Sequence, residues 1–187
     1  MRKSSRKFHV VLALVVAMVG SAFAIAPAGA SASCNFGGLT AAETDLCTPA
    51  ANASLLASGE LIAPAGAPAR VKAVIAAANK IRLRPYIYGG GHASFASRGY
   101  DCSGSVSFAL HGGNFLSSPL PSGPLETWGE EGEGRWITVY ANSGHAYMTV
   151  AGYRFDTSGD EGEETGPRWH EELRTNEGFV ARHPTGF

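Results

Sequence analysis

The sequence has little charge, and the charge it has is nearly balanced. Charged residues make up 17% of the 187 residues, with Lys+Arg 15 against Asp+Glu 16. After the first seven residues there is no Lys/Arg-rich patch of the kind that nucleic-acid-binding proteins carry, so nucleic acid is not an expected partner. The hydrophobic share of 44% is enough for a packed core, and the length suits one ordinary domain.

Motifs for metal ions and nucleotides are missing. Histidines and carboxylates are scattered, and neither a His-Glu-x-x-His motif nor the paired cysteine spacing of a zinc site occurs, so we expect no metal site. The glycine run Gly89–Gly91 is not followed by the Gly-Lys-Ser/Thr of a phosphate-binding loop. The sequence therefore predicts a protein that works without a cofactor.

Residues 1–32 have the three parts of a secretory signal peptide. Basic residues fill four of the first seven positions, the strongly apolar stretch Val10–Val19 follows, and small residues lead to Ala32. That stretch is shorter than the ~20 residues that a membrane span needs, and nothing after it is apolar enough to span. We expect cleavage after Ala32 and a secreted or cell-wall-associated monomer that is not inserted in the membrane.

Three cysteines remain after position 32, and their number is odd. Cys34 and Cys47 lie close together in a segment rich in Gly, Ala, Ser, Thr and Pro, and outside the cell we expect them to form a disulfide. This pairing leaves Cys102 as a free thiol. We therefore divide the exported chain into a disulfide-stapled arm and linker, residues 33–67, and a main domain, residues 68–187.

The main domain has helical patterns first and strand patterns later, which is an α+β order. Apolar spacing predicts a helix from Pro68 to Ile81, and Asp101 is a suitable N-cap for a second helix from Cys102 to about Leu110. We expect long loops at 114–135 and an exposed acidic loop at 160–164. Strands are expected at 136–140, 145–150, 153–157 and, closing the sheet, 178–182.

Cys102 stands where a cysteine becomes reactive. The nucleophilic form is the thiolate, and the N-terminus of a helix stabilises it through the helix dipole and unpaired N–H groups. The same N–H groups can hold a developing oxyanion. Asp101 opposes thiolate formation, so a nearby imidazole is required. The other interpretation is an inert buried thiol in a core helix.

His145 is the best candidate for that imidazole, because it opens a strand directly after Ser143 and Gly144. If Ala151 and Gly152 form a two-residue turn, Asp156 becomes the diagonal neighbour of His145 on one face of the hairpin. A carboxylate there would orient the imidazole. A one-residue bulge would instead turn Asp156 to the other face.

Together these residues resemble the NlpC-type cell-wall cysteine peptidases. The resemblance rests on Pro85–Gly90, on Gly99–Val106 with its Asp-Cys-Ser-Gly helix start, and on Gly144-His145, and it covers about residues 68–182. It implies a papain-like α+β fold, with the nucleophile helix packed on an antiparallel sheet. It also implies hydrolysis of peptide bonds in the stem peptides of bacterial peptidoglycan.

The resemblance also assigns roles to individual residues. Cys102 matches the nucleophile, His145 the general base, and Asp156 the third polar residue. Tyr86 matches a tyrosine that lines the site near the oxyanion. Asp101 and Ser103 match positions that hold the amine of the substrate in some members.

The chain departs from the family pattern at several positions. Asp156 replaces the usual His, Tyr88 a common Trp, and Tyr147 a residue that is often small. The 114–135 loop has no clear match, and no repeated wall-binding module is present. Two alternatives therefore stay open: a non-catalytic, secreted wall-binding protein on the same fold, and an amidase or acyl transferase that uses the same thiol.

The cysteine pairing is directly testable. Mass spectrometry of the exported protein, alkylated without prior reduction, should find one modified cysteine, Cys102, and a disulfide-linked peptide containing Cys34 and Cys47. On the loop-entropy argument this disulfide stabilises the folded chain by about 3 kcal/mol. Alkylation of Cys34 and Cys47 in the unreduced protein would show the pairing to be wrong.

Overall fold

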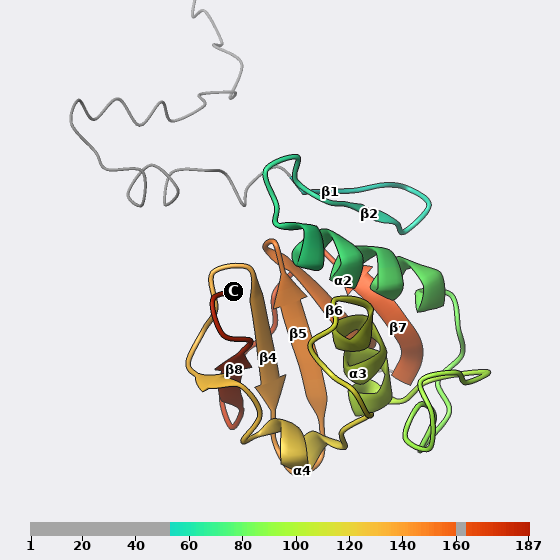
Figure 1. Cartoon of the computed structure of the whole chain (residues 1–187). Helices are drawn as coiled ribbons and strands as arrows, with labels where there is room; N and C mark the ends of the chain where they lie inside the picture. The colour runs from blue at the N-terminus through green and yellow to red at the C-terminus, as the bar shows by residue number, and fades with distance from the viewer. Residues whose placement is uncertain (1–52, 160–163) are drawn as a thin grey trace, which may run out of the picture. The chain divides into compact units, whose positions relative to one another are not determined.

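Apolar side chains at helical spacing place two helices against one face of a sheet. The computed structural model describes residues 53–159 and 164–187, and the expected signal peptide and the Cys34–Cys47 pair lie outside these ranges. In Figure 1 the helices α2 (Ala69–Ile81) and α3 (Cys102–Gly112) lie in front of the strands of the main sheet, and a small separate hairpin lies beyond α2. No helix in the described ranges is long and apolar enough to cross a membrane.

The helices begin and end where the sequence indicates. Helix α2 (Ala69–Ile81) follows Pro68 and buries one apolar face that includes Val71, Val74 and Ile75. Helix α3 (Cys102–Gly112) has Asp101 as its N-cap, and the Asp101 carboxylate accepts a hydrogen bond from the Gly104 N–H. Both predicted helices are thus confirmed, with α3 two residues longer than expected.

The main sheet has six strands in the order β3-β8-β4-β5-β6-β7, and every pair is antiparallel. Helix α3 packs on β5 and β6, and α2 packs on β7. The α+β prediction is therefore confirmed. The strands are β3 (Glu130–Glu131), β4 (Ile137–Ala141), β5 (Ala146–Val150), β6 (Tyr153–Ser158), β7 (Glu164–His170) and β8 (Val180–His183).

The hairpin of β5 and β6 has the predicted register. Val150 pairs with Tyr153 and Met148 with Phe155, so Ala151 and Gly152 form the two-residue turn. Both turn residues have positive φ, 51° at Ala151 and 89° at Gly152, as a type I′ turn requires. The alternative with a bulge between β5 and β6 is thereby excluded, and Asp156 lies on the predicted face.

Besides the small hairpin in the linker, three elements were not predicted. Strand β7 begins inside the expected acidic loop and contains Gly166 and Pro167, which normally argue against a strand. These two residues are tolerated because β7 is an edge strand of the sheet. The 114–135 segment, expected to be a loop, contains the short helix α4 (Ser122–Leu125) and strand β3.

The described part of the expected linker packs on the main domain. Strands β1 (Ser54–Leu55) and β2 (Leu61–Ile62) form a small antiparallel hairpin. The Asn79 side chain of α2 accepts a hydrogen bond from the Leu61 N–H and donates one to the Leu61 carbonyl oxygen. Leu61 is 1% exposed, so this hairpin contributes to the apolar core.

A segment of nine residues, 171–179, connects the outer strand β7 to β8, which lies on the far side of β4. We call it the crossover segment. It must cross β6, β5 and β4, and its residues line cavities together with Arg154 of β6 and Tyr147 of β5. Their neighbours in the strands, Phe155 and Met148, belong to the core instead. The crossover segment therefore covers the sheet face opposite the helices.

Gly104 lets the loop before α3 approach the helix closely. A Cβ at position 104 would collide with the carbonyl oxygen of Gly90, which also accepts a hydrogen bond from the Asp101 N–H. We expect Gly104→Ala to lower the free energy of unfolding by ~1–3 kcal/mol through overpacking, measured by urea denaturation. Gly123→Ala is the matched control, because nothing lies within 4 Å of its Cβ position. Equal stabilities of the two variants would contradict this packing argument.

Candidate active site

Cys102 is the first residue of α3 and lies at the junction of the helix and the sheet. It is 9% exposed and is a free thiol. The first intrahelical bond runs from the Ser105 N–H to the Asp101 carbonyl, and the Asp101 side chain takes the Gly104 N–H. The amide of Cys102 itself precedes this bonded part of the helix, as is usual in a first turn.

His145 is held just before β5 by the turn that precedes the strand. The Asn142 side chain accepts hydrogen bonds from the backbone N–H groups of Gly144 and His145, at 2.9 and 2.8 Å. The imidazole is 21% exposed, and its Nε2 lies 2.9 Å from Oδ1 of Asp156. The structure therefore brings two of the three residues nominated from the sequence into direct contact.

Asp156 is fully buried and is surrounded by donors. Its Oδ1 accepts from His145 and from the Ser158 N–H at 3.1 Å, and its Oδ2 accepts from Arg154 at 2.9 Å and Arg174 at 3.0 Å. Burial alone would raise the pKa of this carboxyl, but the His145 hydrogen bond and charge, with the other donors, lower it to about 2. The carboxylate is therefore ionised across the physiological range.

The imidazole of His145 is stabilised in its charged form. Burial lowers its pKa, but hydrogen bonds to Asp156 and to Cys102, together with the charges of both groups, raise the pKa to about 9. The Cys102 side chain is thus close enough to the same imidazole to contribute to this shift. Because Nε2 faces Asp156, Nδ1 is the nitrogen left to exchange a proton with the thiol.

A second histidine lies beside the start of α3. Nε2 of His92 is 2.9 Å from Oδ2 of Asp101 and 3.0 Å from Oγ of Ser103. Asp101 and Ser103 are 4% and 2% exposed, and Asp101 also accepts from the Gly89 N–H. The sequence analysis assigned no role to His92. The signal that indicates this contact is the glycine turn at 89–91, which returns the chain to Asp101.

The two remaining aromatic candidates have different surroundings. Tyr86 forms an isolated bridge with Tyr100, two residues before Cys102, so its backbone lies beside the start of α3. Tyr147 is 2% exposed and stacks on Tyr140, with ring centroids 4.9 Å apart. Burial raises the pKa of Tyr147 to about 12, so its hydroxyl stays protonated. Its ring centroid is 6.3 Å from that of His145.

Within residues 53–159 and 164–187, no three His, Cys, Asp or Glu side chains gather as a metal site would require. The reactive groups of this site are thus a thiol, an imidazole and a carboxylate, with the imidazole next to the carboxylate. This arrangement can deprotonate the thiol, deliver it to a carbonyl carbon, and return the proton to a leaving group.

No protein-family model and no curated protein matches the chain. Solved structures do. The chain is similar to NlpC/p60 domain proteins. The resuscitation promoting factor interacting protein RipA matches at 21% identity with a TM-score of 0.44, over 61% of this chain and 62% of that chain. The peptidoglycan hydrolase RipB from Mycobacterium tuberculosis matches at 23% and 0.45, over 60% and 64%.

RipD from Mycobacterium tuberculosis, a non-catalytic NlpC/p60 domain protein adapted to peptidoglycan binding, matches at 19% identity with a TM-score of 0.46, over 63% of this chain and 98% of RipD. The matched part spans less than two thirds of the RipA and RipB chains. At these identities and TM-scores the likenesses carry no conclusion about activity. That conclusion rests on the residues of this chain.

The His145–Asp156 pair should make stability depend on pH in a defined way. The lowered pKa of Asp156, about 2, contributes stability above pH ~4 that is lost as the pH falls towards 2. The raised pKa of His145, about 9, contributes stability below pH ~6.5 that is lost as the pH rises through 9.

The difference in unfolding free energy between wild type and Asp156→Asn should therefore be largest between pH 4 and 6.5. It should exceed its values at pH 2.5 and pH 9.5 by about 2 kcal/mol, measured by urea denaturation at the three pH values. The loss of the carboxylate charge beside Arg154 and Arg174 adds a cost that does not vary with pH, because arginine stays charged. A difference that is constant with pH would contradict the ion pair.

Proposed function

We propose that this chain is an exported cysteine hydrolase that cleaves amide bonds in the stem peptides of bacterial peptidoglycan. The observation that supports the proposal is the contact of His145 with the buried Asp156, together with the position of Cys102 at the N-terminus of a helix and its effect on the pKa of His145. The proposed substrate is supported by the sequence resemblance around Cys102 and His145. Export is supported by the signal-peptide pattern of residues 1–32.

In the proposed reaction Cys102 loses its proton to Nδ1 of His145 and attacks the carbonyl carbon of the scissile amide. The developing oxyanion is held by the Cys102 amide at the start of α3, with Tyr86 nearby. His145 then donates its proton to the leaving amine, and a thioester remains on Cys102. Water, deprotonated by His145, attacks the thioester, and the acid product leaves as the Cys102 thiol re-forms.

Asp156 has the role of holding His145 in place. Its Oδ1 fixes Nε2 as the protonated nitrogen and stabilises the imidazolium that forms in the first step. An ionised, fully buried carboxylate is suited to this role because its position does not depend on solvent. The Asp in the third position is thus chemically competent, although the resembling family usually has His there.

The test is digestion of purified peptidoglycan by the full chain, with released products identified by mass spectrometry. Cys102→Ala and His145→Ala should each lower product formation by at least about 10³-fold, because each removes one of the proposed catalytic groups. His111→Ala is the matched control, because His111 lies exposed at the far end of α3 and should leave activity unchanged. Product masses distinguish a bond within the peptide from the bond between sugar and peptide.

Products that persist in Cys102→Ala would refute the thiol mechanism. No products from several wall types, with the wild type folded and co-sedimenting with the wall material, would favour the non-catalytic binding protein instead.

A further inference from the structure

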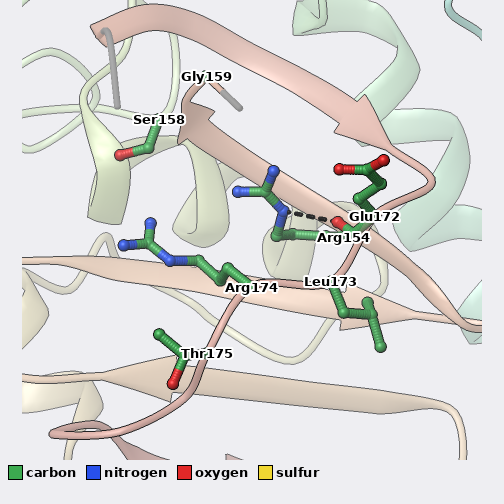
Figure 2. Close-up of a pocket in the computed structure, with 7 residues that line it drawn as sticks. All are labelled: Arg154, Ser158, Gly159, Glu172, Leu173, Arg174 and Thr175. Atoms are coloured by element: carbon green, nitrogen blue, oxygen red, sulfur yellow. Dashed lines mark hydrogen bonds between the residues drawn. The ribbon is translucent and has the colours of Figure 1, made fainter. Parts of the chain in front are cut away.

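A cavity of about 410 Å³ lies on the sheet face opposite the helices, between the end of β6 and the crossover segment. Figure 2 shows the seven residues that line it. We call it the arginine cavity; its lining residues are Arg154, Ser158, Gly159, Glu172, Leu173, Arg174 and Thr175. Neither its side chains nor its location are used by the proposed reaction, apart from the shared contact with Asp156.

Two guanidinium groups enter this cavity beside a single carboxylate. Arg154 and Arg174 both donate to the same oxygen, Oδ2 of Asp156, at 2.9 and 3.0 Å. Arg154 is 3% exposed and also donates its Nε to the Glu172 carbonyl oxygen at 3.0 Å. The Asp156 carboxylate is thus shared between both guanidinium groups and the His145 imidazole.

Arg174 has donors to spare. A guanidinium carries five N–H groups, and within the described residues Arg174 uses one of them, on Asp156. Its side chain is 31% exposed, so a ligand that enters the cavity can reach it. The cation also lies near the faces of Tyr147 and Phe179, at 5.3 and 5.6 Å from the ring centroids, and these contacts hold its position.

In Figure 2 the Arg174 guanidinium and the Ser158 hydroxyl lie on the left of the view, and the Arg154 guanidinium lies between them and Glu172. Arg154 donates to the Glu172 carbonyl oxygen, so Glu172 neighbours this guanidinium. Arg174 is the cation that lies on the same side as the Ser158 hydroxyl.

We infer that the arginine cavity binds a carboxylate group, held by the unused N–H groups of Arg174 with the Ser158 hydroxyl as an additional donor. A planar carboxylate matches the fork of a guanidinium and can accept two parallel hydrogen bonds from it. Small organic acids and the carboxylates of peptides are the ligand class.

The test uses N-acetylglycine as the probe and its neutral isostere N-acetylglycinamide as the matched ligand, with the full chain at pH 7 and constant ionic strength. Isothermal titration calorimetry should give saturable binding of N-acetylglycine with a Kd of about 1 mM, a value expected for so small a ligand. The amide should bind at least tenfold more weakly. No turnover is needed, so the result is independent of the proposed hydrolase function.

Variants locate the binding. Arg174→Gln should weaken the binding of N-acetylglycine at least tenfold, and Arg174→Lys should be intermediate because it keeps the charge but loses the fork. Arg84→Gln is the matched control: it removes the same charge from an exposed position that lines another cavity, and should bind like the wild type. Thermal unfolding checks that each variant is folded, and Arg174→Lys serves if Arg174→Gln is not.

Three outcomes would overturn the inference: equal binding of acid and amide, unchanged binding in both Arg174 variants, or equal loss in Arg84→Gln. The first would show that the carboxylate is not recognised. The second would place the ligand elsewhere. The third would show attraction to the overall charge only.

Discussion

The burial of Asp156 is the constraint on which the rest of this region depends. A carboxylate without solvent is costly unless donors surround it, and here an imidazole, a backbone N–H and two guanidinium groups do so. These donors come from β6, from the residue before β5 and from the crossover segment. The requirements of one side chain therefore fix the relative positions of three parts of the chain that are distant in sequence.

A second carboxylate, that of Asp101, organises the start of α3. Asp101 caps the helix and also receives hydrogen bonds from the Gly89 N–H and from His92. These hydrogen bonds stabilise the negative charge of Asp101, although this residue stands next to Cys102. The negative charge that argues against a thiolate at this position in the sequence is, in the folded chain, engaged by donors of its own.

The parts of this structure that the sequence predicted are those governed by local patterns. Apolar spacing and an Asp at the cap position define α2 and α3, and the Ala151-Gly152 turn defines the register that brings Asp156 to His145. Alternation along two paired strands was enough to choose Asp156 among the acids of the chain.

What was missed depends on contacts between distant segments. Gly166 and Pro167 made the sequence of β7 look unlike a strand. They are compatible with a strand here because β7 lies at the edge of the sheet. Arg154 and Arg174 were not nominated, because no spacing in the sequence relates residue 174 to Asp156. For His92, the glycine turn at 89–91 indicates a reversal of the chain, but the sequence does not say that the reversal ends beside Asp101.

The crossover segment has a consequence for the order in which the chain is made. Cys102 and His145 are synthesised before Asp156, and Arg174 follows Asp156 by 18 residues. A nascent chain that ends between these two positions has a carboxylate that lacks one of its two guanidinium partners, and the segment that crosses the sheet is still missing. A chain that ends before residue 174 would therefore lack part of the shell of donors that holds Asp156 against His145.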